Sequence, residues 1–331
     1  MARYLVTGGA GFIGSHLVET LLKGGEQVTV LDNFSTGKEE NLLFVGELPL
    51  PPGEYTLLRG DIRDLTTCQE ACKGVDFVLH QAALGSVPRS IDDPVTTNEV
   101  NIQGTLNMLV AARDARVKKF LYASSSSVYG DTASSGINQA EVRPKVESQI
   151  PNPQSPYAVS KLTGEYYCSV FSKVYQLETI CLRYFNVFGQ RQDANSHYAA
   201  VIPKFISALV NDQAPTIYGD GEQSRDFTYV ENVVQANLKG CSTSSDIPDS
   251  VFNIACGERT TLNALYALLC KIMDSKQQPH YAPPRPGDVR HSLADISKAA
   301  AAINYSPSVT IGEGLKKTVD WFANSSSRHT I

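Results

Sequence analysis

The stretch "VTGGAGFIGSH", residues 6–16, decides the fold of this chain. It joins a short apolar run to a pattern of helical spacing, and its glycines Gly8, Gly11 and Gly14 form G-x-x-G-x-x-G. Glycine at such positions permits a tight turn and lets the backbone approach a pyrophosphate closely. The free N–H groups at the start of the helix then bind the anion. The stretch therefore predicts a dinucleotide-binding loop between the first strand and the first helix.

Acidic residues end the next two apolar runs. Asp32 ends the second run at the distance from the glycine loop that is typical of a dinucleotide fold. A carboxylate there binds the ribose hydroxyls and repels a 2′-phosphate, which favours NAD over NADP. Asp61 ends the third run. Two interpretations of Asp61 stay open, contact with the adenine and the N-cap of the next helix.

Short apolar runs alternate with helical patterns through the first half of the chain. The runs span residues 3–8, 27–32, 55–61, 76–83, 118–125 and 178–185, and the main helical patterns span 12–24, 94–115 and 157–176. Runs that are apolar on both faces predict a parallel sheet covered by helices on two sides. The expected fold class is α/β, a doubly wound, Rossmann-type parallel sheet with a smaller mixed α/β substrate domain.

The sequence pattern changes after residue 185, where loops rich in Gly, Pro and Asp separate the predicted helices. We expect residues 1–185 to form the NAD-binding domain, to which the chain returns at 227–256. Residues 186–226 and 257–331 should then form the nucleotide-sugar-binding domain. The connection 33–54 is long and contains prolines, and the pattern assigns it no element.

Composition narrows the class of protein. The chain has 331 residues, 42% of them hydrophobic, and a formal net charge of −5, which argues against nucleic-acid and membrane-surface partners. Seven cysteines form no C-x-x-C pair, and six histidines are scattered, so we expect no metal site and no disulfide framework. No apolar stretch approaches the ~20 residues of a membrane span. These features indicate a cytoplasmic protein.

A tyrosine and a lysine stand four residues apart in "SPYAVSK", residues 155–161. On a helix this spacing puts Tyr157 and Lys161 on one face. An ordinary surface pair is the simplest interpretation of the two residues alone. Beside a nicotinamide, however, a tyrosinate can remove a hydroxyl proton, and a neighbouring ammonium lowers the pKa of the phenol. The strip "YASSSSVYG", residues 122–130, supplies hydroxyl groups at the end of the fifth strand.

The chain resembles the extended short-chain dehydrogenase/reductase family, whose members modify nucleotide sugars. The resemblance runs over essentially the whole chain and rests on the order and spacing of several short motifs. These motifs are "TGGAGFIGSH", "HQAA", "SSSSVYG", "SPYAVSK", "LRYFNVFG", "GDGEQSRDF" and "PGDVRHS".

The resemblance implies a role for each matching residue. Tyr157 would be the catalytic base, Lys161 its electrostatic partner, and Ser125 or the adjacent Ser126 the hydroxyl that bonds the sugar. Residues implied to bind NAD are Gly8, Gly11, Phe12, Ile13, Gly14, Asp32, Asn33, Asp61, Ile62, Gln81, Ala82, Ala83, Tyr157, Lys161 and Tyr184. Residues implied to bind the substrate are Gly85, Ser86, Ser125, Ser126, Tyr157, Asn186, Gln192, Ala200, Val201, Tyr218, Arg225, Arg285, Asp288 and Ser292.

The serine strip distinguishes between the reactions of this family. Dehydratases resemble "TDEVYG" here and decarboxylases carry a glutamate, whereas this chain has Ser126 and Ser127. Without a second carboxylate, oxidation at C4 can be followed only by return of the hydride. The resemblance thus implies an NAD-dependent UDP-sugar 4-epimerase that acts through a 4-keto intermediate. Partners would be the UDP-sugar and a second copy of the chain, in a homodimer formed through helices 94–115 and 157–176.

The sugar is inferred from one small residue. Galactose-restricted relatives carry a tyrosine where this chain has Ser292, so a serine leaves room for an N-acetyl group. The resemblance is therefore closest to the UDP-N-acetylglucosamine 4-epimerases, with UDP-glucose and UDP-galactose as further substrates. Ser292 could instead cap the following helix. Two other functions stay open, a UDP-glucuronate 4-epimerase and a non-catalytic NAD-binding scaffold; the scaffold would be expected to lack Tyr157 or Lys161.

Overall fold

The computed structural model describes residues 1–51, 53–130, 143–194, 196, 199–243, 250–284 and 290–328, with backbone only beyond residue 324. Seven parallel strands form the central sheet in the order β11-β6-β5-β4-β1-β2-β3. Their bounds are β1 Arg3–Thr7, β2 Gln27–Asp32, β3 Tyr55–Arg59, β4 Phe77–His80, β5 Lys119–Ser125, β6 Glu178–Tyr184 and β11 Val251–Ile254. The predicted Rossmann-type α/β fold is confirmed.

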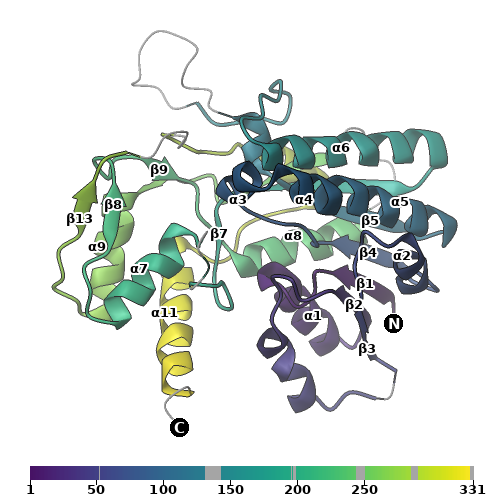
Figure 1. The fold of residues 1–331 in the computed structure, drawn as a ribbon, viewed down its shortest axis with the longest axis horizontal. Helices are drawn as coiled ribbons and strands as arrows, with labels where there is room; N and C mark the ends of the chain where they lie inside the picture. Colours follow the sequence, from purple (N-terminus) through teal and green to yellow (C-terminus); the bar gives the residue numbers. More distant parts are fainter. Residues whose placement is uncertain are drawn as a thin grey trace.

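Helices cover both faces of this sheet, as Figure 1 shows. One face carries α1 (Phe12–Lys23) and α8 (Val230–Ser242), and the other carries α2 (Leu65–Ala71), α5 (Gly104–Asp114) and α6 (Pro156–Tyr175). Alternate residues of each strand enter the two layers: in β1, Tyr4 and Val6 pack with the first set and Leu5 packs with the second. Both faces are therefore buried, as the continuous apolar runs predict.

The helix predicted over residues 94–115 is three consecutive pieces. These are α4 (Pro94–Asn98), a π-helical turn η2 (Glu99–Gln103) and α5. A π turn often marks a functional position. Here the side chain of Asn101 in that turn binds the backbone of Leu84, accepting from its N–H at 2.8 Å and donating to its carbonyl at 3.2 Å. The helix predicted over 157–176 is α6, which Ser155 caps by accepting the N–H of Ala158.

The segment that the sequence left unassigned contains a 3-10 helix, η1 (Glu39–Glu47). The segments after β4 and β5 contain α3 (Val87–Asp92) and the 3-10 turn η3 (Ser126–Tyr129). None of the helices in the described ranges is long and apolar enough to cross a membrane.

The remaining elements pack around a third core, built on Phe188, Phe205, Leu265 and Leu315. The helices of this core are α7 Val201–Val210, α9 Leu262–Met273 and α11 Ile311–Arg328, whereas α10 Ser297–Ile303 packs against α8 and β11 in the core of the main sheet. The short strands are β7 Val187–Phe188, β8 Thr216–Tyr218, β9 Ser224–Arg225, β10 Thr228–Tyr229, β12 Thr260–Thr261 and β13 His280–Ala282. They pair as β10–β7, β12–β9 and β13–β8, beside the main sheet at the left of Figure 1.

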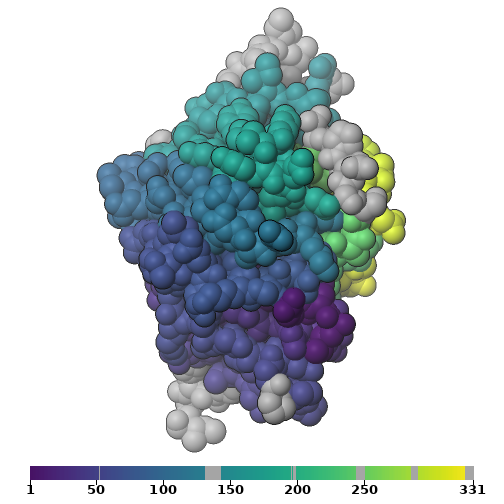
Figure 2. Space-filling model, turned by 90° about the vertical axis from the view of Figure 1, so that its right-hand side faces the viewer, coloured from purple at the N-terminus to yellow at the C-terminus, as the bar shows by residue number. Residues whose placement is uncertain are grey.

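The chain returns to the main sheet with β11, which pairs in parallel with β6. This strand falls inside the range 227–256 that was predicted to rejoin the NAD-binding domain, while the domain division itself stays a prediction. Figure 2 shows the face made mostly by the first half of the chain, coloured purple to teal, with the yellow C-terminal part only at one edge.

Candidate active site

The glycine loop forms the tight turn that its sequence predicts. Gly8 has φ +67°, and a Cβ there would lie 2.8 Å from the backbone of Ala82. A Cβ on Gly14 would lie 2.1 Å from the carbonyl oxygen of Gly8, so helix α1 could not pack this closely with any other residue. Gly11 is the N-cap of α1. The loop leaves a cradle in front of the first turn of the helix, where the N–H groups can bind an anion.

A cleft of about 280 Å³ opens over this loop, along the carboxyl ends of the sheet strands. Every residue predicted to bind NAD lines it: Gly8, Gly11, Phe12, Ile13, Gly14, Asp32, Asn33, Asp61, Ile62, Gln81, Ala82, Ala83, Tyr157, Lys161 and Tyr184. We call this the first cleft. The dinucleotide motif and the Tyr157–Lys161 pair, which are far apart in sequence, thus share one cavity.

Asp32 ties the glycine loop to the turn that follows β2. Its Oδ2 accepts the backbone N–H of Ala10 at 2.9 Å, and its Oδ1 accepts that of Phe34 at 2.8 Å. Burial raises the pKa of this carboxyl, and the two N–H groups oppose that rise. A Cβ on Gly37 would lie 2.9 Å from Oδ2, so this glycine keeps the space beside the carboxylate open.

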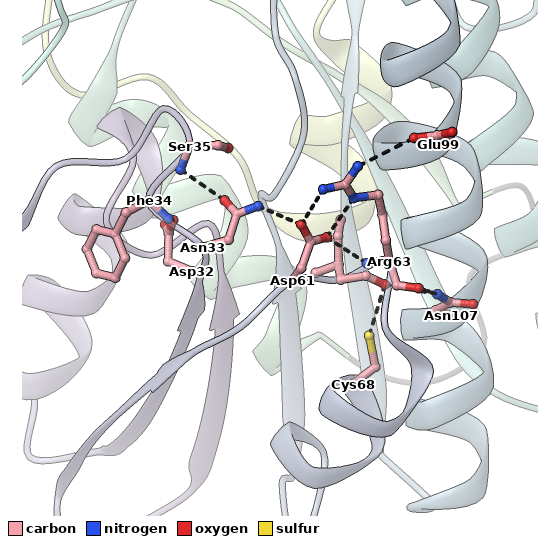
Figure 3. A network of polar contacts seen from close by, with 10 residues as sticks. Asp32, Asn33, Phe34, Ser35, Asp61, Arg63, Cys68, Glu99 and Asn107 are labelled. Atoms are coloured by element: carbon pink, nitrogen blue, oxygen red, sulfur yellow. Dashed lines mark hydrogen bonds and ion pairs between the residues drawn. The ribbon is translucent and has the colours of Figure 1, made fainter.

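Asp61 lies at the centre of a polar network at the same end of the cleft, shown in Figure 3. It accepts hydrogen bonds from Asn33 at 2.8 Å and from Nη2 of Arg63 at 2.8 Å. Arg63 also reaches Glu99 at 3.4 Å. The hydrogen bond from Arg63 lowers the pKa of Asp61 to about 2. The helix that follows is capped by Asp64, so the interpretation of Asp61 as that N-cap is wrong.

Tyr157 and Lys161 line the other end of the first cleft, and Ser125 lies beside Tyr157. Ser125 accepts the N–H of Ser127 at 3.1 Å, and its hydroxyl lies close enough to the Tyr157 phenol to favour a lower pKa of that phenol. The Nζ of Lys161 donates to the carbonyl of Ala123 at 2.8 Å and lies 5.9 Å from the ring centre of Tyr157. These contacts favour Ser125 over Ser126 as the partner of the phenol.

The electrostatics of the pair differ from the sequence expectation. Burial raises the pKa of the Tyr157 phenol, and the hydrogen bond with Ser125 only opposes that rise. Burial also lowers the pKa of Lys161 to about 8. The expected lowering of the phenol pKa by Lys161 is therefore wrong for the protein alone, because Nζ bonds a carbonyl and desolvation has the larger effect.

Tyr184 and Gln81 also line the first cleft and are hydrogen-bonded to each other. The Tyr184 hydroxyl accepts from Nδ2 of Asn237 at 2.9 Å and exchanges hydrogen bonds with Gln81 at 3.2 and 3.3 Å. Burial raises the pKa of this phenol to about 12. The Tyr184 side chain is therefore held in place and stays protonated, so it does not act as a second base.

A second cleft of about 300 Å³ continues from the first at the end of β6, where Tyr184 lines one and Asn186 the other. It contains six of the predicted substrate-binding residues: Asn186, Gln192, Ala200, Val201, Tyr218 and Arg225. Phe188, Phe205 and Phe227 add aromatic faces. Flat apolar walls with a few polar groups suit a nucleoside.

The other predicted substrate residues lie outside this second cleft. Gly85 lines the first cleft, and Ser86, with φ +139°, caps α3. Ser292 is buried, and its N–H donates to the carbonyl of Ser224 beside Arg225. Its alternative role as a helix cap is wrong, since α10 begins at Ser297 after Ile296. Arg285 and Asp288 lie outside the described residues.

Comparison with known proteins identifies the family. The profile of the NAD dependent epimerase/dehydratase family matches residues 4–255. The chain belongs to the NAD dependent epimerase/dehydratase family. This family match confirms NAD as the cofactor. The cleft fits that cofactor, because the glycine cradle excludes any Cβ and Asp32 offers a carboxylate at the end of β2.

Members of this epimerase/dehydratase family match nearly the whole chain. The UDP-glucose 4-epimerase of Mycolicibacterium smegmatis is 36% identical over 327 residues, covering 98% of this chain and 99% of that protein. A structure of UDP-N-acetylglucosamine 4-epimerase from Methanobrevibacter ruminantium, in complex with UDP-N-acetylmuramic acid, is 41% identical with a TM-score of 0.89. It covers 98% of this chain and 99% of its own.

A third relative carries both kinds of ligand. The UDP-glucuronic acid 4-epimerase from Bacillus cereus, in complex with UDP-glucuronic acid and NAD, is 32% identical with a TM-score of 0.87 and covers 98% and 99% of the two chains. The predicted resemblance to nucleotide-sugar 4-epimerases is therefore confirmed. The relatives differ in the sugar that their names give, so the resemblance is to the group and not to one substrate.

The sequence missed several residues that line the two clefts. Ser35, Thr36 and Gly37 follow Asp32 in the segment that had no predicted element, and Gln223 lines the second cleft. The Oε1 atoms of Gln192 and Gln223 are buried and have no hydrogen-bond partner in the described part of the chain. Gln192 was a predicted substrate-binding residue, whereas the only sequence signal for Gln223 was its position in the loop "GDGEQSRDF", next to an acidic residue. Among the described residues, no three His, Cys, Asp or Glu side chains are grouped as a metal site.

Proposed function

We propose that this enzyme catalyses the NAD-dependent C4 epimerisation of a UDP-hexose, most readily UDP-N-acetylglucosamine and UDP-N-acetylgalactosamine, through a 4-keto intermediate. The observation that supports it is the position of Tyr157 and Lys161 at the end of a dinucleotide cleft, with Ser125 beside the Tyr157 phenol. UDP would occupy the second cleft, and the hexose would reach past Asn186 to Tyr157.

The carboxylates of the first cleft support epimerisation over elimination or decarboxylation. Among the described residues that line it, Asp32 and Asp61 are the only acids. Both lie at the end of the cleft away from Tyr157, and both already accept hydrogen bonds from neighbouring groups. Glu165 is close to the serine strip but is held in an ion pair with Arg183. Among the described residues near this end of the cleft, no acid is therefore available to remove water or to act at C5.

The protein supplies the proton transfer. Tyr157 takes the proton of the C4 hydroxyl, while Ser125, whose Oγ is already oriented by the N–H of Ser127, bonds the same oxygen. NAD bound in this cleft would supply the hydride acceptor and donor for C4 and the positive charge of its oxidised ring. Gly8, Gly11 and Gly14 would hold its pyrophosphate, Asp32 the adenosine ribose, and Lys161 the nicotinamide ribose. Turning the 4-keto sugar before the hydride returns gives the epimer.

The sugar preference rests on three features. The structure named for UDP-N-acetylglucosamine is the relative with 41% identity, and Ser292 is small where galactose-restricted relatives have a ring. UDP-glucuronate is the second candidate because of the 32% identical relative. Its carboxylate, however, would need a cation, and Lys161 is the only one among the described residues of the first cleft. Lys161 already bonds Ala123 and is needed for the cofactor.

A direct test is substrate profiling. Purified protein is incubated separately with the UDP forms of N-acetylglucosamine, N-acetylgalactosamine, glucose, galactose and glucuronic acid, and products are resolved by chromatography and proton NMR. We expect interconversion of the N-acetylated pair without net NADH release. Steady accumulation of NADH, or a product other than the C4 epimer, contradicts the 4-epimerase proposal. Turnover of glucuronate above the N-acetylated pair contradicts the sugar assignment.

An exposed apolar stripe supports the proposed homodimer. Val159, Tyr166, Val170 and Val174 follow one side of α6 with exposed fractions of 47–63%. Val95 of the adjacent helix α4 is 66% exposed. Contiguous exposed apolar surface of this kind is typical of an interface. A second copy packing the same face would bury it with two-fold symmetry. The two-domain division and the cytoplasmic location stay predictions.

A further inference from the structure

The ammonium of Lys161 lies in a buried site without an acidic partner among the described residues. The side chain is 4% exposed, and its Nζ makes one hydrogen bond, to the carbonyl of Ala123. No carboxylate contributes to its pKa, which burial lowers. A buried ammonium without a counter-ion tends to lose its proton. Something other than a carboxylate must therefore stabilise the charge.

Two aromatic rings face this ammonium. The centre of the Tyr122 ring lies 5.0 Å from Nζ and that of Tyr157 lies 5.9 Å away. A cation within about 6 Å of a ring face is attracted by the negative charge of that face, and the attraction grows when water is excluded. Tyr122 is the nearer ring, and it belongs to β5, next to Ala123. The same short segment thus provides both the carbonyl and the closer ring.

Tyr122 is held rigidly from both sides. Its ring stacks on the imidazole of His80 at 6.0 Å with an interplanar angle of 19°. His80 is in turn hydrogen-bonded to Thr7 at 2.8 Å and to Thr105 at 3.0 Å. On the α6 side the chain has a glycine, Gly164, where a Cβ would come within 2.2 Å of the Tyr122 hydroxyl. The ring cannot move away from Lys161 without displacing the sheet or the helix.

The ring, and not the hydroxyl, is the part of Tyr122 that interacts. Its hydroxyl is buried and has no hydrogen-bond partner in the described part of the chain. The titratable groups around Lys161 are Tyr157 and Cys168 from α6, Tyr122 from β5 and His80 from β4. Burial, aided by the charge of Lys161, lowers the pKa of His80 to about 3, so the imidazole beneath the ring stays neutral. Nothing on that side repels the ammonium.

We propose that Tyr122 is a positioning residue of the reaction, whose ring face holds the ammonium of Lys161 in place and charged beside Tyr157. Only the purpose of that charge, support of the Tyr157 phenolate and of the cofactor ribose, rests on the proposed function. The stack of Lys161, Tyr122 and His80 is a property of the protein itself and can be tested without turnover.

The test varies the ring at position 122 while keeping its shape. Residue 122 is replaced by Phe and then by phenylalanines with one, two and three ring fluorines, which progressively weaken the negative ring face. The protein carries lysine labelled with ¹³C at Cε, and Lys161→Met assigns the Lys161 signal. Its NMR shift is followed against pH in each variant. We expect Tyr122→Phe to titrate like the wild type and each fluorine to lower the pKa of Lys161, by about one unit in total.

Phe120 provides the matched control. It lies two residues earlier in β5, is buried, and its ring also contacts His80, at 5.5 Å. Trifluorination at position 120 should leave the Lys161 titration unchanged. Equal titration of all position-122 variants overturns the proposal, as does an equal shift from position 120. If the wild type proves inactive on every UDP-sugar, the proposed function fails while this measurement still gives its result.

An activity measurement adds a second readout. Tyr122→Leu removes the ring, and the high-pH limb of kcat should then move to lower pH by a similar amount, with little change in KM. Thermal denaturation checks that the variant is folded; if it is not, the fluorinated series alone decides. A loss of kcat that is uniform across pH would instead indicate a purely structural role and contradict the proposal.

Discussion

The carboxylate of Glu165 and the guanidinium of Arg183 form a bidentate ion pair inside the protein, at 2.8 and 2.7 Å. Their side chains are only 4% and 5% exposed. The hydroxyl of Ser124 donates to the same carboxylate, and the guanidinium lies 4.6 Å from the ring centre of Tyr129. The pair therefore connects α6, which carries the base, to β6 and to both ends of the serine strip.

Breaking this pair should be strongly destabilising. We expect Glu165→Gln to lower the free energy of unfolding by about 3–5 kcal/mol, because Arg183 keeps a buried charge without its counter-ion. Glu165→Gln combined with Arg183→Met should recover part of that loss. Urea denaturation of the two single variants and the double variant measures the coupling. The control is Glu231→Gln, which breaks an exposed ion pair with Lys317 and should change stability by less than about 1 kcal/mol. Additive losses in the double variant would contradict this prediction.

Asp32 should control the affinity for NAD. It holds the glycine loop through Ala10 and lines the cleft where a ribose would bind. Hydrogen bonds to a charged group contribute about 1.5–3 kcal/mol, so Asp32→Asn should weaken NAD binding by roughly 10- to 100-fold. The affinity of this variant for NADP should fall less than its affinity for NAD, or should rise, because the carboxylate no longer repels the 2′-phosphate. Fluorescence titration with both dinucleotides measures the ratio.

The control for Asp32 is Asp76→Asn. Asp76 also accepts a backbone N–H, from Arg3 at 2.8 Å, but lies outside the cleft. Its substitution should leave both dinucleotide affinities unchanged. Equal weakening by the two variants would mean that Asp32 acts through the fold and not through the ribose.

Tyr157→Phe should abolish most of the activity and spare the fold. The ring still packs, and only the proton acceptor is lost, so kcat should fall by at least ~10²-fold while NAD still binds. Tyr175→Phe, at the exposed C-terminal end of the same helix and outside the stripe, removes an equivalent hydroxyl and should retain full activity. Activity within a few-fold of the wild type in Tyr157→Phe would assign the base to another residue, such as one of the serine strip.

The sequence predicts the parts of this site that depend on short motifs. Gly8, Gly14, Asp32 and the Tyr157–Lys161 pair are each placed by one strand end, one helix start or one helical turn. Local rules of this kind need no knowledge of distant residues. Once the strand order follows from the alternating pattern, these ends converge on the same edge of the sheet. For this reason the predicted NAD-binding residues all line one cleft.

The parts that the sequence did not predict depend on contacts between distant segments. The π-helical turn at Asn101 is stabilised by hydrogen bonds of its side chain with the backbone of Leu84 and with the hydroxyl of Ser160 in α6, the latter at 3.0 Å. No spacing rule in the sequence predicts these contacts. The raised phenol pKa of Tyr157 likewise follows from burial, which a sequence pattern does not measure. Tertiary packing sets both features.

The exposed stripe on α6 should mediate dimerisation. A carboxylate placed in an apolar interface is costly unless it finds a partner, so Val170→Glu should weaken the dimer by at least ~100-fold. Light scattering after size-exclusion chromatography gives the mass, near twice 36.0 kDa for the wild type. Val210→Glu on α7 makes the same chemical change outside the stripe and should remain a dimer. A wild-type mass of a single chain would contradict the homodimer.

Ser292 should decide whether the C2 substituent of the sugar is accommodated. The residue is buried beside Ser224, next to Arg225 of the second cleft, so a larger side chain must either displace its neighbours or occupy sugar space. Ser292→Tyr should lower kcat/KM for UDP-N-acetylgalactosamine by about tenfold or more relative to UDP-galactose, since one excluded group is worth roughly 1–3 kcal/mol.

The ratio of the two kcat/KM values separates this effect from a loss of stability, because a loss of stability lowers kcat/KM for both substrates alike. Ser292→Ala is the matched control, because it removes the hydroxyl without adding volume and should keep the wild-type ratio. Ser292→Val extends the series if the tyrosine variant fails to fold, and it should shift the ratio in the same direction by a smaller factor. A ratio that stays constant from Ala through Val to Tyr would exclude Ser292 as the determinant and leave the choice of sugar to Gly85, Gln192 and the other residues around the clefts.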